Sequence, residues 1–519
     1  MKRIFTLTFF SLIFLGLNAQ TRYVDEVFTD VEVQSDIIYA TNIEVLTGMP
    51  VAVDLKLDVY TPAGDTETER PLIKVFHTGN FLPQLVNGQI NGNKNDPYLV
   101  DMIERLVRRG YVVASVGYRL GWNPISPDQD VRTETLINAA YRGVQDSHAA
   151  TRFFRKSIEE GNPYGINGND IINWGVGTGS YISLAAGTID TYTDVLLPKF
   201  IKADQTPMVI EAVHGDPFGE NMAIINIPNN PGFSNDISLT VNMGGALGDL
   251  SWMDADDTPI VSIHVPTDPF APYNTDFLIV PTTGDLVVEV SGSFDLQERA
   301  TELGINGAFT IGTLYDDPQT ESALQNNEGN EGLFPLLRPS WDLDGDPTTP
   351  AAEESSPWDW WDAAFWSMSQ PQQCADMMIP LTACNWDLLS RANNPDASFD
   401  KGTTYMDSII GYYAPRAMVT LELPGYEVYL DSMINVTDIL DASVMTLAPN
   451  PASTSVKVVA NGKNINSIAI FGIDGRLYDQ ITNVNAESAV IQRNNLPTGI
   501  YFVKAYFDDG IATQKVTFE

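Results

Sequence analysis

The stretch INWGVGTGSYISLAAG, from Ile172 to Gly187, decides the fold of the larger part of the chain. It predicts a buried strand, a tight turn and the beginning of a helix. Its central GVGTG, residues 175–179, has the spacing of G-x-S-x-G, the nucleophile elbow that holds a catalytic serine on a strained turn. The position of that serine is occupied by Gly177, which has no side chain. The stretch therefore predicts an elbow whose nucleophile position is vacant.

Strand and helix patterns alternate on both sides of this stretch, between residues 51 and 425. Such alternation predicts an α/β fold, with a mostly parallel sheet covered by helices. From residue 273 to residue 382 the pattern loosens, and we interpret this part as an irregular insertion or cap. A last helix and a short strand are expected over 405–425. The other expected strands are 55–62, 71–79, 111–121, 237–245 and 259–268, and the other expected helices are 96–110 and 134–161.

The first twenty residues predict export. Lys2 and Arg3 precede an apolar run from Ile4 to Leu17, and small residues follow near Ala19. This is the pattern of a cleavable signal peptide, and the run is too short for a lasting membrane span. No later stretch reaches about 18 consecutive apolar residues, so we expect no transmembrane span in the mature chain.

The charge balance excludes one class of partner. The chain has 67 Asp and Glu against 29 Lys and Arg, a formal net charge of −38. A surface of this kind repels the phosphates of nucleic acids and the headgroups of anionic lipids. We therefore expect no nucleic-acid partner.

The tail, residues 444–519, follows a linker over 426–443 and has turn signals about every ten residues, which predicts a small all-β sandwich. LAPNPAS, IAIFGIDGRL, LPTGIYFVKA and the closing QKVTFE appear in this order. On these segments the tail resembles the type A C-terminal sorting domain of the type IX secretion system. The resemblance implies that the secretion machinery is a partner, and that the domain is removed as the protein is released or attached at the cell surface. An ordinary β-sandwich binding module is the alternative.

The body, residues 21–425, resembles the α/β-hydrolase fold in its carboxylesterase and hormone-sensitive-lipase-like branch. The resemblance rests on VFHTGNF, on YRLGWNP, on the run into the elbow and on PIVSIHVPTDPFAPY. It implies that Gly79 and Asn80, with Thr178 after the elbow position, supply backbone N–H groups to an oxyanion. It also implies that Asp268 is the acidic member of a catalytic triad.

The triad is incomplete in two places. In this fold the order along the chain is nucleophile, acid, histidine, but no histidine follows Asp268. With Gly177 at the nucleophile position, Asp268 is a remnant acid. The alternative is a displaced nucleophile, Ser180 or Thr178, for instance Ser180 with His214 as its base. The four histidines are His77, His148, His214 and His264.

Two further features concern stability and metal binding. DLDGDPTTPAAE, residues 342–353, places acidic side chains at positions 1, 3, 5 and 12 of a calcium loop, but proline replaces the glycine at position 6. We expect no cofactor other than Ca²⁺ at this loop, and a solvated acidic loop is the alternative. The only two cysteines are expected to form a disulfide. The residues concerned are Asp342, Asp344, Asp346 and Glu353 for calcium, and Cys374 and Cys384 for the disulfide.

These observations together predict an exported, esterase-like protein that is secreted or held at the cell surface. Our first hypothesis is a catalytically impaired hydrolase homologue, a pseudoenzyme that binds a small ester or glycan ligand. The second is an active carboxylic ester hydrolase with a displaced nucleophile. The third is a structural or adhesion protein of the cell surface. Whether the chain is an enzyme is the question that the elbow leaves open.

Overall fold

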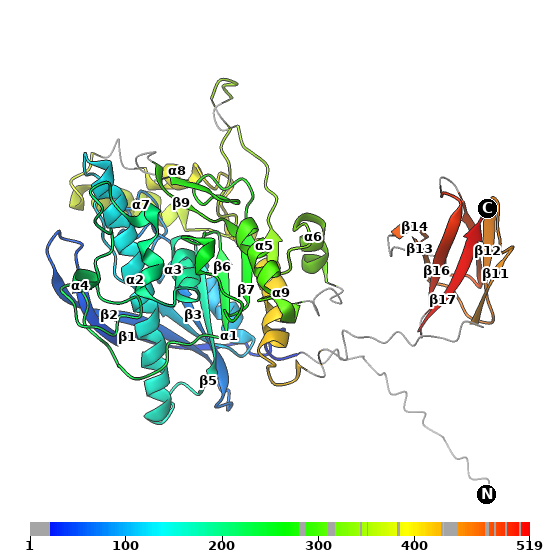
Figure 1. The fold of residues 1–519 in the computed structure, drawn as a ribbon, viewed down its shortest axis with the longest axis horizontal. Coiled ribbons are helices and arrows are strands. Elements are labelled where there is room, and N and C mark those ends of the chain that lie inside the picture. The colour runs from blue at the N-terminus through cyan, green and yellow to red at the C-terminus, as the bar shows by residue number, and fades with distance from the viewer. Residues whose placement is uncertain are drawn as a thin grey trace, which may run out of the picture. The chain divides into compact units, whose positions relative to one another are not determined.

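The computed structural model describes residues 21–279, 286–309, 317–342, 345–349, 351–380, 385–426, 429 and 444–519, except for 473–476, 482–483, 494–495 and 508–509. The predicted signal peptide, residues 1–20, lies outside the described residues, as does most of the predicted linker. The chain divides into two compact units, the first of which ends at Tyr426 (Figure 1).

The first unit is built on an eight-stranded sheet in the order β1-β2-β4-β3-β5-β6-β7-β10. β2 is antiparallel to both of its neighbours, and every other neighbouring pair is parallel. The prediction of a mostly parallel sheet is therefore confirmed. The strands are β1 (Val31–Glu44), β2 (Val51–Pro62), β3 (Arg70–Phe76), β4 (Val112–Val116), β5 (Ile166–Val176), β6 (Leu239–Met243), β7 (Ile260–His264) and β10 (Leu333–Pro335).

Helices cover both faces of this sheet. Asn173 of β5 donates its side-chain N–H to Ser147 Oγ of α2 at 3.3 Å. The next residue, Trp174, has its ring centroid 4.6 Å from that of Tyr413 on α9. Because successive side chains of a strand point to opposite faces, α2 and α9 lie on opposite faces of the sheet. The helix α1 packs against α9, and α3 packs against α2. Their bounds are α1 (Pro97–Arg108), α2 (Gln129–Glu159), α3 (Thr178–Ala186) and α9 (Phe399–Thr420).

The region from residue 273 to residue 382 is more regular than the sequence predicts. It supplies β10, which pairs with β7 and completes the main sheet. With three residues, β10 is too short to give a periodic signal. The other elements here are the hairpin β8 (Asp276–Ile279) and β9 (Leu286–Val290), with α5 (Ser293–Leu303), α6 (Pro318–Asn326) and α7 (Ala363–Asp376).

Two further boundaries differ from the prediction. The strand expected over 111–121 ends at Val116, and the residues after it leave the sheet. The short strand expected near residue 425 is wrong, because α9 continues through Pro415 to Thr420 and a turn follows. The first unit also contains the short helices α4 (Glu211–His214) and α8 (Trp386–Arg391).

The second unit consists of two antiparallel sheets, in agreement with the all-β prediction. Buried side chains from both sheets, among them Val456, Ile470 and Val503, form one hydrophobic core. One sheet has the order β11 (Met445–Ala448), β12 (Ser455–Ala460), β15 (Ser488–Gln492), and the other has the order β14 (Leu477–Ile481), β13 (Ser467–Gly472), β16 (Gly499–Phe507), β17 (Gly510–Phe518).

Candidate functional site

The segment from β5 to α3 forms the predicted strand, turn and helix. Gly177 stands between them with φ 52° and ψ −115°, a backbone conformation that a residue with a side chain adopts only under strain. Its N–H donates to Met243 O at 2.8 Å, which ties the turn to β6. The turn is thus as sharp and strained as a nucleophile elbow requires.

The glycines on either side of Gly177 are required by close approach of the backbone. A Cβ atom on Gly175 would lie 2.3 Å from Gly179 O. A Cβ atom on Gly179 would lie 2.0 Å from Phe76 O, at the end of β3. Both contacts are with backbone atoms, which cannot rotate away as a side chain can. The elbow geometry is therefore built into the chain by these two glycines.

The space above the elbow is occupied by a side chain that the sequence analysis did not single out. A Cβ atom on Gly177 would lie 2.4 Å from Thr78 Oγ1 and 3.0 Å from Thr78 Cβ. Thr78 follows β3 in the loop that corresponds to the predicted oxyanion loop. The available signal was the threonine in HTGN, where an HGGG-type loop has glycine.

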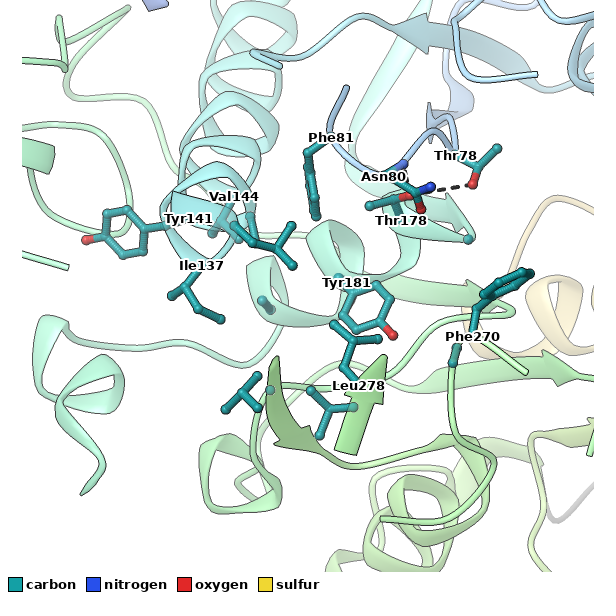
Figure 2. A pocket seen from close by; sticks show the side chains of 18 of the residues that line it. Thr78, Asn80, Phe81, Ile137, Tyr141, Val144, Thr178, Tyr181, Phe270 and Leu278 are labelled. Carbon is teal, nitrogen blue, oxygen red and sulfur yellow. Dashed lines mark hydrogen bonds between the residues drawn. The ribbon is translucent and has the colours of Figure 1, made fainter. Parts of the chain in front are cut away.

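The predicted oxyanion donors converge on one point, and a hydroxyl of the chain itself occupies that point. Thr178 Oγ1 accepts a hydrogen bond from Gly79 N at 3.1 Å and another from Asn80 N at 2.8 Å. Thr78 Oγ1 lies 3.5 Å from the same oxygen. Figure 2 shows Thr78, Asn80 and Thr178 close together beside the pocket. Two of the three predicted donors are therefore bound to the third residue's side chain.

Asp268 lies just after β7, with its side chain 4 % exposed. Its Oδ1 accepts hydrogen bonds from Phe270 N at 2.8 Å and from Ala271 N at 3.3 Å. Its Oδ2 lies 3.8 Å from His264 Nε2. Burial raises the pKa of Asp268 to about 7, although the two backbone N–H groups act in the opposite direction. The predicted acid is thus a buried carboxyl group that is held by hydrogen bonds to its Oδ1.

His264 does not have the free nitrogen that a general base needs. Its Nε2–H donates to Ala271 O at 3.1 Å, and its Nδ1 accepts from Ser293 Oγ at 2.6 Å. Burial lowers the pKa of His264 to about 4, so the ring is neutral. Nε2 therefore holds the turn that follows β7, and Nδ1 holds the start of α5.

The structure does not bring Ser180 and His214 together as a nucleophile and its base. Ser180 is fully buried, donates its hydroxyl to Gly175 O at 2.7 Å and accepts from Met243 N at 2.9 Å. His214 Nδ1 accepts from Ile210 N at 2.9 Å, within its own turn. Among the hydrogen bonds of the described residues, none joins these two side chains. Ser180 instead fastens the elbow to the sheet.

The remaining two histidines, His77 and His148, pack against aromatic rings. The ring of His77 stacks on Tyr118 at a centroid distance of 4.5 Å, and burial lowers its pKa to about 4. His148 lies on α2 with its ring 5.1 Å from Phe218, and burial lowers its pKa as well. Neither side chain hydrogen-bonds a hydroxyl group of the elbow within the described part of the chain.

A pocket opens beside the elbow, between α2, α3 and the β8–β9 hairpin (Figure 2). Its cavity volume is about 180 Å³. Gly177, Thr178 and Asp268 line it, but most of its wall is aliphatic or aromatic. Representative wall residues are Phe81, Ile137, Val144, Tyr181, Phe200 and Leu278. The sequence does not predict these residues as parts of one site, because they come from separate elements and share no motif.

The acidic loop is only partly described. Asp342 and Asp346 are exposed and accept hydrogen bonds from backbone N–H groups of their own loop, Gly345 N at 2.7 Å and Thr348 N at 2.9 Å. Glu353 is exposed, and Asp344 lies outside the described residues. Within the described residues, no group of three or more acidic, histidine or cysteine side chains is arranged to hold a metal ion. The calcium loop stays a prediction.

Of the predicted cysteine pair, one member is described. Cys374, on α7, is 1 % exposed and disulfide-bonded. Cys384 lies outside the described residues.

Comparison with known proteins gives weak similarities for the first unit. No curated protein matches the chain. The bifunctional GH43-CE protein of Bacteroides eggerthii is 16 % identical, with a TM-score of 0.32; the match covers 52 % of this chain and 31 % of that one. Propionate-bound esterase Est2 of Thermogutta terrifontis is 17 % identical, with a TM-score of 0.28 and coverages of 47 % and 74 %. A truncated carbohydrate esterase from gut microbiota is 16 % identical, with a TM-score of 0.29 and coverages of 55 % and 87 %.

Among the helices of the described residues, none has both the length and the apolar character needed to cross a membrane.

The second unit gives a specific match. Residues 446–519 match the family model of the secretion system C-terminal sorting domain. The chain therefore carries a type IX sorting domain, and the protein is secreted or attached at the cell surface.

Proposed function

We propose that this chain is an exported protein of α/β-hydrolase fold that binds an apolar small molecule beside a vacant elbow and does not hydrolyse it. Three features support the fold assignment. A strained turn links a central strand to a helix at Gly177, the loop after β3 aims Gly79 and Asn80 at that turn, and an aspartate follows β7. These are the elements of the hydrolase elbow, of its oxyanion loop and of its acid.

One observation carries the functional part of the proposal. The N–H groups of Gly79 and Asn80 donate to Thr178 Oγ1, while Thr78 fills the space above Gly177. An oxyanion hole accelerates acyl transfer only when its donors are free to meet the negative charge of the transition state. Here the donors already have a partner, and the nucleophile and base are missing as well.

The missing groups have a large kinetic effect. Removing triad members from a serine hydrolase lowers the rate by about 10⁴- to 10⁶-fold. What survives is the pocket, whose wall is mostly aliphatic and aromatic. Such a wall favours an apolar ligand, because its burial removes apolar surface from water. Among the ligands that the sequence suggests, it favours the acyl or aryl part of an ester over a glycan.

The proposal is tested by hydrolysis of short-chain 4-nitrophenyl esters. We expect the full chain and its Ser180→Ala variant to release nitrophenolate at the rate of buffer alone. Turnover above that rate, abolished by Ser180→Ala and blocked by a serine-directed phosphonate, would overturn the proposal in favour of a displaced nucleophile. Because Ser180 also fastens the elbow, circular dichroism of the variant is the control for folding.

A further inference from the structure

The wall of the pocket contains polar groups without a full set of hydrogen bonds among the described residues. The hydroxyl of Tyr181, on α3, is buried and has no hydrogen-bond partner in the described part of the chain. Asp268 Oδ2 accepts no hydrogen bond from the described residues, and its nearest ion-pair contact is His264 Nε2 at 3.8 Å. Both residues line the pocket. Burial raises the pKa of Tyr181, and the charge of Asp268 raises it further, so the two groups interact electrostatically.

No cation of the described residues balances Asp268. Its one ion-pair contact there is with His264, and that ring is neutral with its Nε2–H donated to Ala271 O. A buried carboxylate without a counter-charge is unfavourable, and it gains most from a partner that brings a positive charge. The free protein therefore holds an unmatched negative group at the wall of an otherwise apolar pocket.

The surroundings select the sign of a ligand's charge. Tyr181 and Phe270 line the same pocket as Asp268, and Figure 2 shows the Tyr181 hydroxyl on the side facing Phe270. Aromatic faces attract cations. The net charge of −38 attracts cations to the molecule and repels anions. A fatty-acid carboxylate would meet both this repulsion and that of Asp268.

We infer that the pocket takes an apolar molecule that carries one cationic amine, with the ammonium group paired to Asp268 and its neighbour Tyr181 accepting one of its hydrogen bonds. This inference rests on the proposed function, since it names the ligand class of the same pocket. The ammonium group supplies N–H donors to Asp268 Oδ2, and the apolar body lies against the aliphatic and aromatic wall. The residue that the hydrolase scaffold uses as an acid becomes the anchor of a cationic head.

Three probes with one chain length test the inference. Octylammonium chloride, octan-1-ol and sodium octanoate are titrated into the full chain at pH 8, and their affinities are measured by isothermal titration calorimetry. An alkylammonium group stays protonated at this pH, as a lysine does. We expect octylammonium to bind at least tenfold more tightly than octanol, and octanoate to bind most weakly.

Two matched variants assign the preference to one carboxyl group. Asp268→Asn should lower the affinity for octylammonium at least tenfold and leave the affinity for octanol within about threefold, because it removes the negative charge and keeps the size of the side chain and one carbonyl acceptor. Asp257→Asn is the control. Burial raises the pKa of Asp257 to about 7 as well, but this residue does not line the pocket. It should leave the order of the three probes unchanged.

The outcomes separate the two proposals. Equal binding of octylammonium and octanol, or tighter binding of octanoate, overturns the inference and leaves a ligand-binding pocket. Binding of none of the three probes contradicts both the inference and the proposed function. If Asp268→Asn fails to fold, the probe series on the unaltered chain still decides the question.

Discussion

Gly177 and Thr78 together define the state of the elbow. The turn keeps the backbone conformation of a nucleophile position, with φ 52° and ψ −115°, and Thr78 takes the space that a side chain there would need. Thr78 Oγ1 therefore lies where a side chain at position 177 would begin. A single Gly177→Ser substitution would place the new Cβ atom against Thr78.

We predict that Gly177→Ser destabilises the chain by roughly 1–3 kcal/mol, the usual cost of overpacking, and that Thr78→Gly relieves part of this cost. In a double-mutant cycle the strain of a side chain at positive φ cancels, so the coupling reports the contact itself. We expect a coupling of about 1 kcal/mol or more, measured by urea denaturation. Additive effects of the two substitutions would contradict the contact with Thr78.

A second prediction concerns Asp268 and pH. Burial raises its pKa to about 7, above the ordinary value of 3.8, so between these pH values the folded state keeps a proton that the unfolded state has lost. Stability from this group therefore falls as pH rises from about 4 to above 7. Asp268→Asn retains an Oδ1 acceptor for Phe270 N and Ala271 N and removes the charge.

The variant should gain stability at pH 8 by roughly 1–3 kcal/mol, at 1.36 kcal/mol per pKa unit and with allowance for relaxation around a buried charge. The gain should approach zero near pH 4, where the folded carboxyl group is already protonated. Melting curves of both chains at several pH values measure the difference, from which the titration of all other groups cancels. A gain that does not depend on pH would contradict the buried, unpaired carboxyl group.

At the level of elements, the sequence predicts the elbow and most of the central strands well, and it predicts the pocket poorly. The glycines of GVGTG let the backbones of β3, β5 and α3 lie close together, where a Cβ atom would collide. The spacing of these glycines therefore predicts the turn. The strand β10 is missed because three residues carry no period, and its neighbours in the chain resemble a loop. The pocket wall comes from α2, α3 and the β8–β9 hairpin, whose contacts depend on tertiary packing.

The predicted site residues likewise divide into those whose positions the sequence predicts and those whose contacts it does not predict. The backbone donors Gly79 and Asn80 converge as the motif implies, since a loop after a strand fixes their direction. The hydroxyl that accepts their hydrogen bonds belongs to Thr178. No sequence motif predicts that a side chain of the same chain will accept these hydrogen bonds. The spacing of residues along the chain thus predicts the path of the backbone better than it predicts which side chain will contact that backbone.

The elbow gives a prediction at this scale. Gly179→Ala should destabilise the first unit by about 3 kcal/mol or more, or prevent folding, because its Cβ would lie 2.0 Å from Phe76 O. Gly307→Ala is the matched control, since no atom of the described residues lies within 4 Å of the added Cβ atom. That control should stay within about 0.5 kcal/mol of the unaltered chain in urea denaturation. Equal effects of the two substitutions would show that the elbow is not closely packed.

At the scale of the whole molecule, charge and export are connected. The sorting domain over 446–519 indicates secretion or attachment at the cell surface. A protein there works in an ionic medium, and the net charge of −38 adds self-repulsion to the folded state at low salt. The charge balance and the destination are the two whole-chain properties that the sequence predicts without reference to any fold.

We therefore predict that salt stabilises the protein. Raising the ionic strength from about 0.01 M to 0.5 M shortens the Debye length from about 30 Å to below 10 Å and screens the repulsion among carboxylates. The melting temperature should rise by a few degrees, equally with sodium chloride and with choline chloride if screening is the cause. A decrease with both salts would contradict this view, and an increase with sodium alone would point to a specific cation site.

The central claim is that the pocket holds a ligand without cleaving it. The most direct test is a mass balance on a long-chain ester, 4-nitrophenyl octanoate, incubated with the full chain and then separated from it by rapid gel filtration. We predict that intact ester elutes with the protein in a saturable amount and that nitrophenolate forms no faster than in buffer. Nitrophenolate released faster than in buffer, in proportion to the protein added, would contradict the account and show that the elbow still supports catalysis.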